Sequence, residues 1–241
     1  MTAAPLLETR ALSRRFGGVV ALAGVDFALA ERELCCLIGP NGAGKSTFFK
    51  CLTGQLAPSA GAIRLRGREI AGAPSHRIAR LGIGIKTQVP SLFDGLTALD
   101  NAWLAARRRL PGRPARAAAL AMLERIGISA LATRTVASLG HGERQLVELA
   151  MVLAGDPALI LLDEPTAGMS RAEVERIAAL IREIARDHAL IVVEHDMRFV
   201  SMIAGRVCVF HDGAVLADGP LAEVLADARV QAVYLGRGGR S

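Results

Sequence analysis

A phosphate-binding loop is the most specific chemical pattern in the chain: residues 39–47 read GPNGAGKST, which fits the P-loop spacing G-x-x-x-x-G-K-[ST]. An apolar run at 34–38 precedes it and a helix-compatible run at 47–52 follows, so the loop lies between a buried strand and a helix N-terminus. Backbone N–H groups in such a loop bind phosphate oxygens, and the helix start adds partial positive charge. Lys45 can reach the β- and γ-phosphates, and the Ser46 hydroxyl can ligate Mg²⁺. The sequence therefore predicts a nucleotide site made by Gly39, Pro40, Asn41, Gly42, Ala43, Gly44, Lys45, Ser46 and Thr47.

Acidic and imidazole side chains follow two further apolar runs. Asp163 and Glu164 come after the run at 159–162, and His195 comes shortly after the run at 190–193. Because ligands bind at the carboxyl ends of parallel strands, we expect these side chains beside the P-loop. There Asp163 can hold Mg²⁺, Glu164 can polarise a water for attack on the γ-phosphate, and His195 can contact that phosphate. The ordinary alternatives are a solvated strand end for the two acids and a structural role for the histidine.

Two other residues carry weaker signals. Phe16 precedes the P-loop region, where an aromatic ring can stack on a purine, but its spacing fits an ordinary core phenylalanine equally well. Gln88 follows the apolar stretch at 82–85, and a glutamine in such a place is more often a surface residue. Neither residue can be assigned a role from its spacing alone.

Composition indicates a packed protein of one large or two small domains. The 241 residues are 51% hydrophobic and 22% charged. No apolar run reaches the roughly 18 residues that span a bilayer, and the N-terminus lacks a signal-peptide pattern, so we expect a cytoplasmic protein. The four cysteines lack C-x-x-C spacing and are expected to be small buried hydrophobes.

The net charge is +6, and its densest part is a group of arginines at positions 107, 108, 109, 113 and 116. This group fits a solvated helix end, and the alternative is a membrane-proximal or nucleic-acid-binding patch.

The pattern of apolar residues predicts an α/β fold. Residues 6–33 have the alternation of a small β region, whereas 90–157 are rich in Ala and Leu and are expected to be helical. Buried strands at 34–38, 159–162 and 190–193 alternate with helices, which predicts a parallel sheet with right-handed crossovers. Ser170 and Glu173 form a capping box for the helix that follows, and Val174, Ile177, Ile181 and Ile184 lie on one face of it.

The order of these motifs resembles the ATPase subunit of an ABC transporter over nearly the whole chain. The resemblance implies a P-loop NTPase (RecA-like) core with an antiparallel β subdomain and a helical insertion. Its single domain would span 6–241, with the core at 6–89 and 158–241 and the helical subdomain at 90–157. It also implies that Phe16 stacks on adenine, that Gln88 links Mg²⁺ and the γ-phosphate to a membrane partner, and that residues 167–170 form the D-loop. Asp163 would be the Walker B aspartate, Glu164 the catalytic base and His195 the switch histidine.

The segment that resembles the family signature departs from the common Leu-Ser-Gly-Gly-Gln. It reads Leu139, Gly140, His141, Gly142 and Glu143, so the serine whose hydroxyl bonds the partner's ATP is replaced by glycine. Loss of one such bond to a charged group would cost about 1.5–3 kcal/mol. The helix N-terminus that follows still presents N–H groups to phosphate. We expect weaker ATP-driven dimerisation, and we hypothesise that His141 replaces the missing donor.

A narrower resemblance concerns the transported solute. The segments 16–22, 163–169, 193–197 and 233–236 are similar to the ATPases for uptake of branched-chain amino acids and their urea and amide relatives. The presence of a histidine at position 141 is a point in which the chain resembles the ATPases of the urea branch. The Tyr-Leu-Gly ending is shared with the lipopolysaccharide-export ATPase, which is the alternative transport function.

The resemblance implies ATP hydrolysis with Mg²⁺, at the inner face of the cell membrane. Expected partners are permease subunits, a second ATPase and, indirectly, a periplasmic or extracellular solute-binding protein, with no nucleic acid. The subfamily often pairs two different ATPases, which favours a heterodimer over a homodimer. Other possibilities are a non-transport ABC ATPase and a regulatory module that no longer hydrolyses ATP. A P-loop kinase or a GTPase is disfavoured, because a lid with an acceptor pocket and a guanine-specific N-K-x-D stretch are both lacking.

Overall fold

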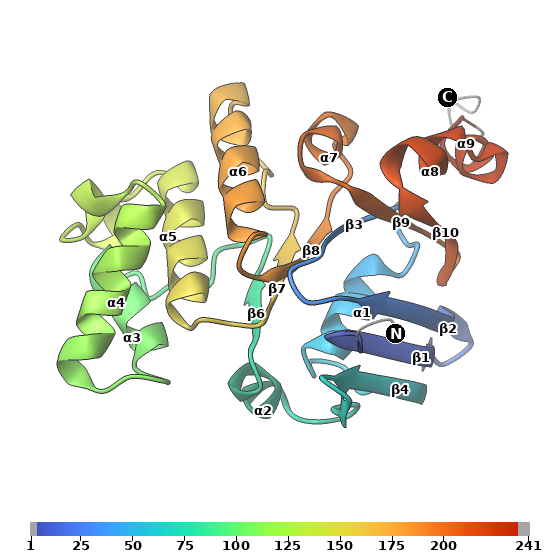
Figure 1. The fold of residues 1–241 in the computed structure, drawn as a ribbon, viewed down its shortest axis with the longest axis horizontal. Coiled ribbons are helices and arrows are strands. Elements are labelled where there is room, and N and C mark those ends of the chain that lie inside the picture. The colour runs from blue at the N-terminus through green and yellow to red at the C-terminus, as the bar shows by residue number, and fades with distance from the viewer. Residues whose placement is uncertain (1–3, 236–241) are drawn as a thin grey trace.

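Two β-sheets and a group of helices make up residues 4–235, which are the residues that the computed structural model describes (Figure 1). The larger sheet has the strand order β10-β9-β3-β8-β7-β6. Its strands from β9 to β6 are parallel, and β10 pairs antiparallel with β9. The strands are β3 (Leu34–Ile38), β6 (Ile83–Lys86), β7 (Leu159–Asp163), β8 (Ala189–Val193), β9 (Arg206–His211) and β10 (Ala214–Pro220).

The parallel strands are apolar because both faces of this sheet are covered. Alternate residues of β3 and β7 belong to two different hydrophobic cores: Cys36 and Ile160 face one, and Cys35 and Leu159 face the other. Such burial on both faces is typical of parallel sheets with crossover helices. The predicted parallel α/β core is therefore confirmed.

The smaller sheet is antiparallel and forms the β region that was predicted near the N-terminus. Its order is β2-β1-β4-β5, with β1 (Leu7–Phe16), β2 (Val19–Leu29), β4 (Ala60–Leu65) and β5 (Arg68–Glu69). Helix α1 (Lys45–Leu52) packs between the two sheets, because its Phe48 ring lies 5.7 Å from the ring of Phe27 and 5.3 Å from that of Phe210. This packing fixes the end of the P-loop against both sheets.

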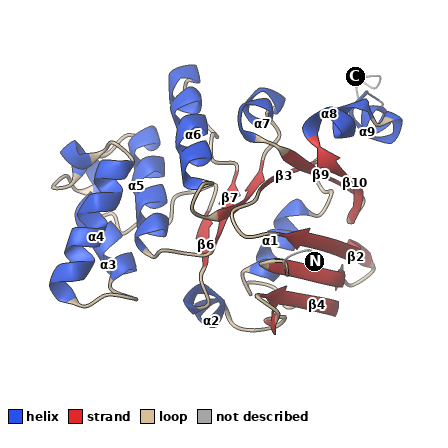
Figure 2. Cartoon of the chain, in the orientation of Figure 1, coloured by secondary structure: helices blue, strands red, loops and turns tan. Residues whose placement is uncertain are grey.

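Helices dominate the chain between the two halves of the core, on the left of Figure 2. Helix α2 (Ser75–Arg80) precedes β6, and α3 (Ala98–Ala106), α4 (Gly112–Arg125) and α5 (His141–Ala154) follow it, with 3-10 turns at Ser129–Leu131 and Val136–Ser138. Buried alanines such as Ala102 on α3 and Ala119 on α4 let these helices approach closely. The subdomain limits at 90 and 157 stay a prediction.

The second half of the core adds α6 (Arg171–Ile184), α7 (Met197–Ile203), α8 (Leu221–Ala226) and α9 (Ala228–Leu235). The predicted capping box is present, since Ser170 Oγ caps the backbone N–H of Glu173 and Ser170 N donates to the Glu173 carboxylate at 2.8 Å. The C-terminal residue of the Tyr-Leu-Gly ending, Gly236, lies outside the described residues.

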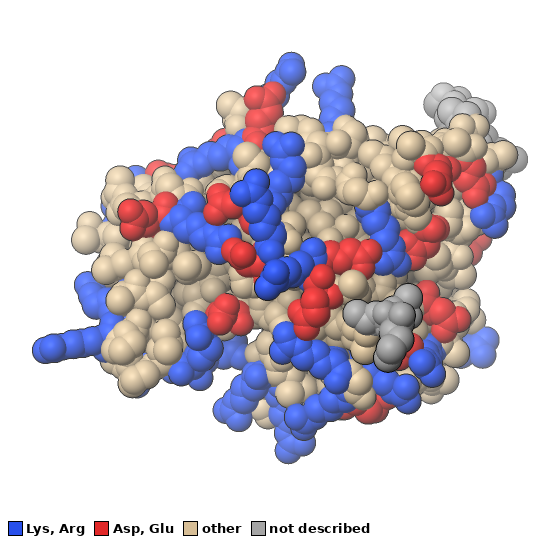
Figure 3. All heavy atoms as spheres, viewed as in Figure 1, with Lys and Arg blue, Asp and Glu red and all other residues tan. Residues whose placement is uncertain are grey.

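Charged side chains are interspersed over the face drawn in Figure 3. Within the arginine group at the end of α3 and the start of α4, Arg109 pairs with Asp156 at 3.3 Å, and the Arg107 guanidinium lies 5.9 Å from the Trp103 ring centre. Among residues 4–235, none of the helices combines the length and apolar character that a membrane crossing requires.

Candidate functional site

The P-loop connects β3 to α1 and bounds a cavity of about 150 Å³, which is lined by residues 41–47 together with Ala21, Glu164 and Val193. Gly44 has φ +104°, and a Cβ there would lie 2.6 Å from the carbonyl oxygen of Ala21. Only glycine fits this position, because a side chain would meet backbone and the conformation is left-handed. This close packing holds the P-loop against β2 at the N-terminus of α1.

Lys45 is the first residue of α1 and is half-buried at the loop. Its Nζ donates to the carbonyl oxygens of Gly39 at 2.6 Å and Pro40 at 3.0 Å. Burial lowers the pKa of Lys45, while the nearby Glu164 and Asp163 carboxylates oppose that shift. The ammonium is thus held over the loop, where a phosphate group would meet it.

Glu164 lies directly after β7 and brings three predicted residues together. Its Oε2 accepts a 2.9 Å hydrogen bond from Nε2 of Gln88, and its Oε1 lies 3.3 Å from Nδ1 of His195. The backbone N–H of Glu164 donates to Val193 O at 2.9 Å, and its φ is +45°. Non-glycine residues with such φ values are uncommon and cluster at functional sites. Gln88 is exposed, as its spacing alone favoured, and it also contacts the candidate base.

Asp163 ends β7 beside this group. Burial raises the pKa of Asp163, and the adjacent Glu164 charge raises it further, whereas Lys45 and Lys86 lower it. Two neighbouring carboxylates in a partly buried place fit a divalent cation, which prefers oxygen ligands. Among the described residues no group of three or more His, Cys, Asp or Glu side chains could hold a metal ion alone. A metal here would need hydroxyl, amide or phosphate oxygens as well.

Phe16 ends β1 with 43% of its surface exposed, so it is not the core phenylalanine that its spacing allowed. The Arg14 guanidinium lies 4.5 Å from its ring centre. An exposed ring of this kind is free to stack on a base, although Phe16 does not line the P-loop cavity.

The signature segment lies at the start of α5, outside the P-loop cavity of the same chain. Gly140 is the N-cap, and its N–H donates to Glu143 Oε2 at 2.9 Å. His141 Nε2 lies 3.1 Å from the carbonyl oxygen of Ala167 and 3.3 Å from Nε2 of Gln145. His141, which we hypothesised to replace the missing donor towards the partner's ATP, thus contacts Ala167 of its own chain, and its role towards a phosphate stays a prediction. Leu139 is buried, and Gly142 packs against the carboxylate of Glu173.

Sequence reasoning missed Glu194, a buried carboxylate between the turns after β7 and β8. Its Oε1 accepts a 2.6 Å bond from Thr166 Oγ1, and its Oε2 accepts a 3.1 Å bond from the His195 backbone N–H. Glu194 is 1% exposed. The signal was a charged residue directly at the end of an apolar strand, where an unpaired charge is costly.

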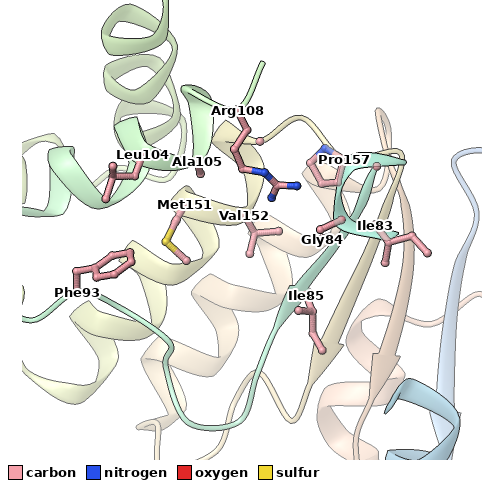
Figure 4. Close-up of a pocket in the computed structure, with 13 residues that line it drawn as sticks. Ile83, Gly84, Ile85, Phe93, Leu104, Ala105, Arg108, Met151, Val152 and Pro157 are labelled. Carbon is pink, nitrogen blue, oxygen red and sulfur yellow. The ribbon is translucent and has the colours of Figure 1, made fainter. Parts of the chain in front are cut away.

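A second cavity of about 420 Å³ lies between β6, α3 and α5 (Figure 4). Its lining is mainly apolar, and Figure 4 shows the side chains of Phe93, Met151 and Val152 directed into one space, with Arg108 at the edge. The cavity adjoins the segment that carries Gln88, because Ile85 and Phe93 flank that segment and both line the cavity.

Comparisons with known proteins agree with this geometry. Residues 22–167 match the family model described as ABC transporter, and residues 214–240 match the model described as branched-chain amino acid ATP-binding cassette transporter.

Three curated relatives cover nearly the whole chain. The high-affinity branched-chain amino acid transport ATP-binding protein BraF of Pseudomonas aeruginosa is 36% identical, and its counterpart LivG of Salmonella typhimurium is 37% identical; each match covers 96% of this chain and 98% of the relative. The lipopolysaccharide export system ATP-binding protein LptB of Acidithiobacillus ferridurans is 38% identical over 96% of this chain and 97% of the relative.

Solved structures show the same fold. The ADP conformation of an ATP-binding cassette of an ABC transporter has a TM-score of 0.88 and 26% identity, and covers 97% of this chain and 100% of its own. The cbiO1 structure from Clostridium perfringens, described as part of the ABC transporter complex cbiONQ, has a TM-score of 0.85 and 30% identity, with 98% of each chain covered.

Proposed function

The chain belongs to the ABC transporter family as an ATP-binding and ATP-hydrolysing subunit, and on this premise we propose that it powers the uptake of branched-chain amino acids or related small polar solutes such as urea and amides. The BraF and LivG relatives carry this choice of solute and favour uptake over the lipopolysaccharide-export alternative, which the LptB relative represents. The match of residues 214–240 to the branched-chain amino acid model agrees with it, but the Tyr-Leu-Gly ending within this segment is shared with the export ATPase.

At the nucleotide, we assign roles to the residues around the P-loop cavity. Residues 39–47 bind the phosphates through backbone N–H groups, and Lys45 stabilises the charge that develops at the γ-phosphate. Glu164 takes the proton of the attacking water, and Gln88 and His195 orient its carboxylate. Phe16 stacks on the adenine ring.

The donor set around Asp163 fits Mg²⁺, which arrives with ATP. Ser46, Gln88 and Asp163 offer a hydroxyl, an amide oxygen and a carboxylate, and Mg²⁺ favours such oxygens together with nucleotide phosphates. When bound, the ion would neutralise phosphate charge. The two acids at the end of β7 support this assignment, because a cation between them and the phosphates would offset their repulsion.

We propose that two ATPase subunits pair head to tail, so that residues 139–143 of one subunit cap the ATP of the other. A second, different ATPase is the expected partner, and a homodimer is the alternative. The N–H groups at the start of α5 support phosphate contact, even though Gly140 stands where the family has serine.

We further propose that permease subunits occupy the apolar cavity between β6, α3 and α5, which would hold the chain at the inner face of the cell membrane. A similar structure is described as part of a multi-component transporter complex, and this supports the partner class. Gln88 stands between Ile85 and Phe93, which line this cavity, and donates to Glu164, which supports coupling of ATP hydrolysis to the permease.

The test is affinity purification of the tagged Glu164→Gln chain with ATP from solubilised native membranes. We expect two multi-spanning permeases and a second ATPase to copurify, and leucine uptake to fall in cells that lack the chain. Copurification of lipopolysaccharide-export proteins would favour the alternative, and recovery of ribosomes or DNA-repair proteins would contradict a transport function.

A further inference from the structure

Three buried polar atoms without a hydrogen-bond partner gather where β6 meets α5: Lys86 Nζ, Gln145 Oε1 and Glu148 Oε2. Among the described residues only one further buried atom of this kind is found, Nε of Arg14. Buried polar groups are almost always hydrogen-bonded, so a cluster of exceptions needs a reason. Lys86 stands two residues before Gln88, Gln145 Nε2 lies 3.3 Å from Gln88 O, and none of the three residues of the cluster lines the P-loop cavity.

Lys86 and Glu148 form a buried ion pair whose facing atoms are not hydrogen-bonded to each other. Lys86 is the last residue of β6, Glu148 lies in the middle of α5, and each side chain is 1% exposed. Lys86 Nζ and Glu148 Oε2 are 3.9 Å apart, which is longer than a hydrogen bond. The attraction between two charges falls with their separation, and from 3.9 Å a small movement of α5 towards β6 would bring these two groups within hydrogen-bonding distance.

Helix α5 holds the segment that carries Gln88 through several bonds. Glu148 Oε1 accepts from Thr87 Oγ1 at 3.2 Å and from the Ser91 backbone N–H at 2.9 Å. Gln145 Nε2 donates to Gln88 O at 3.3 Å. A displacement of α5 against β6 therefore moves residues 87–91, and with them the amide that contacts Glu164.

The same strand and helix form the wall of the apolar cavity. Ile85 precedes Lys86 on β6, and Met151 and Val152 follow Glu148 by one turn of α5; all three line the cavity (Figure 4). An occupant that spreads β6 and α5 at the cavity must also change the separation of Lys86 and Glu148 behind it.

We propose that Lys86 and Glu148 are positioning residues that transmit movements of the cavity wall to Gln88 and so to Glu164. The inference rests on the proposed function in one respect, since the natural occupant of the cavity would be a permease. The transmission from the cavity wall to Gln88 and Glu164 involves only residues of this chain. Because coupling between two sites is reciprocal, nucleotide at the P-loop must also change the cavity wall through the same pair.

The test compares the full-length chain with the double variant Lys86→Met/Glu148→Gln. Removing one charge alone would leave the other buried and uncompensated, which destabilises a protein, whereas replacing both members of a buried pair by uncharged side chains of similar size is often neutral. The control Arg125→Met/Glu183→Gln neutralises another ion pair, 2.9 Å apart, that joins α4 to α6 away from Gln88.

Hydrogen exchange at residues 150–157 is measured with and without a non-hydrolysable ATP analogue and Mg²⁺. These residues neither line the P-loop cavity nor belong to the signature segment 139–143. At a concentration where the chain stays monomeric with the analogue, a change in their exchange therefore reports transmission and not contact with nucleotide. We expect the analogue to change exchange about tenfold in the wild type and the control, and about twofold or less in the double variant, with unchanged nucleotide affinity. An equal change in the double variant, or none in the wild type, overturns the inference.

A second measurement keeps the proposal testable if the double variant fails to fold. Glu148→Asp keeps the charge but shortens the side chain, so the cavity response should fall while nucleotide affinity stays within about twofold. A wild-type response in this variant contradicts the inference. Absence of permeases in the copurification would instead contradict the proposed function, and it would leave the exchange result on the isolated chain unaffected.

Discussion

The side-chain amide of Gln88 donates a 2.9 Å hydrogen bond to Oε2 of Glu164, which stands 76 positions later in the chain. The contact exists because β6 and β7 are neighbouring parallel strands whose carboxyl ends meet at one edge of the sheet. His195, from the next strand β8, approaches the other carboxylate oxygen at 3.3 Å. The turns after the two strands that flank β7 therefore each contribute one side chain to the Glu164 carboxylate.

Replacing Glu164 by glutamine is expected to keep ATP binding and to lower hydrolysis by about 10²–10⁴-fold, because the base that accepts the water proton is lost. Phosphate release and nucleotide binding measure the two effects separately. Glu175→Gln is the control, since Glu175 is exposed on α6 and pairs with Arg171. Near-normal hydrolysis by Glu164→Gln would reject Glu164 as the base.

Replacing Lys45 by alanine is expected to weaken ATP binding by about 10- to 100-fold, which is the loss of one hydrogen bond to a charged group. The ammonium is already desolvated and held at the loop by the carbonyls of Gly39 and Pro40. Titration with a fluorescent ATP analogue gives the affinity. Lys50→Ala is the matched control, because Lys50 is exposed at the other end of α1; equal losses in both variants would contradict the role of Lys45.

Replacing His141 by alanine is expected to reduce ATP-dependent dimerisation in the Glu164→Gln background, as seen by size-exclusion chromatography. The variant removes both a donor at the signature segment and the contact with Ala167 O. Gly140→Ala should behave as the parent, because a Cβ at position 140 would lie 3.8 Å from its nearest neighbour, Glu143 Oε2. A dimer that forms equally well without His141 would show that the N–H groups of α5 suffice.

The four cysteines are buried, and all are expected to resist a thiol reagent at pH 8 until the chain is unfolded.

Burial raises the pKa of Cys36 from the usual 9.0 to about 12, and the nearby Glu194 adds to the shift. A pKa raised in the folded state contributes stability that is complete below 9.0 and is lost as the pH rises towards 12. Cys36→Ala should reduce this loss, which thermal unfolding between pH 8 and 11 can measure.

The fold could be predicted because its signals are local and repeated. Apolar runs gave the strands of the parallel sheet, and the spacing of Val174, Ile177, Ile181 and Ile184 gave the buried face of α6; the last three are buried. Each of these features depends on periodicity within about a dozen residues.

The network around the site was harder to predict, because it depends on contacts between distant segments. Glu148 stands within an apolar stretch of α5, and Lys86 ends an apolar strand; each is a charge where the pattern predicts burial. These two charged residues at positions expected to be buried were the available signal. The spacing of neither residue in the sequence identifies the residue that it pairs with. The exposure of Phe16 and the turn of His141 towards Ala167 depend likewise on tertiary packing.

The left-handed backbone conformation of Glu164 lowers the stability of the folded chain. For a residue with a Cβ, this conformation costs about 1 kcal/mol relative to the right-handed one. Glycine adopts it freely, so Glu164→Gly should fold more stably than Glu164→Ala although neither retains a carboxylate. The glutamate is therefore expected to cost the folded chain stability at this position, which agrees with the catalytic role that we propose for its carboxylate.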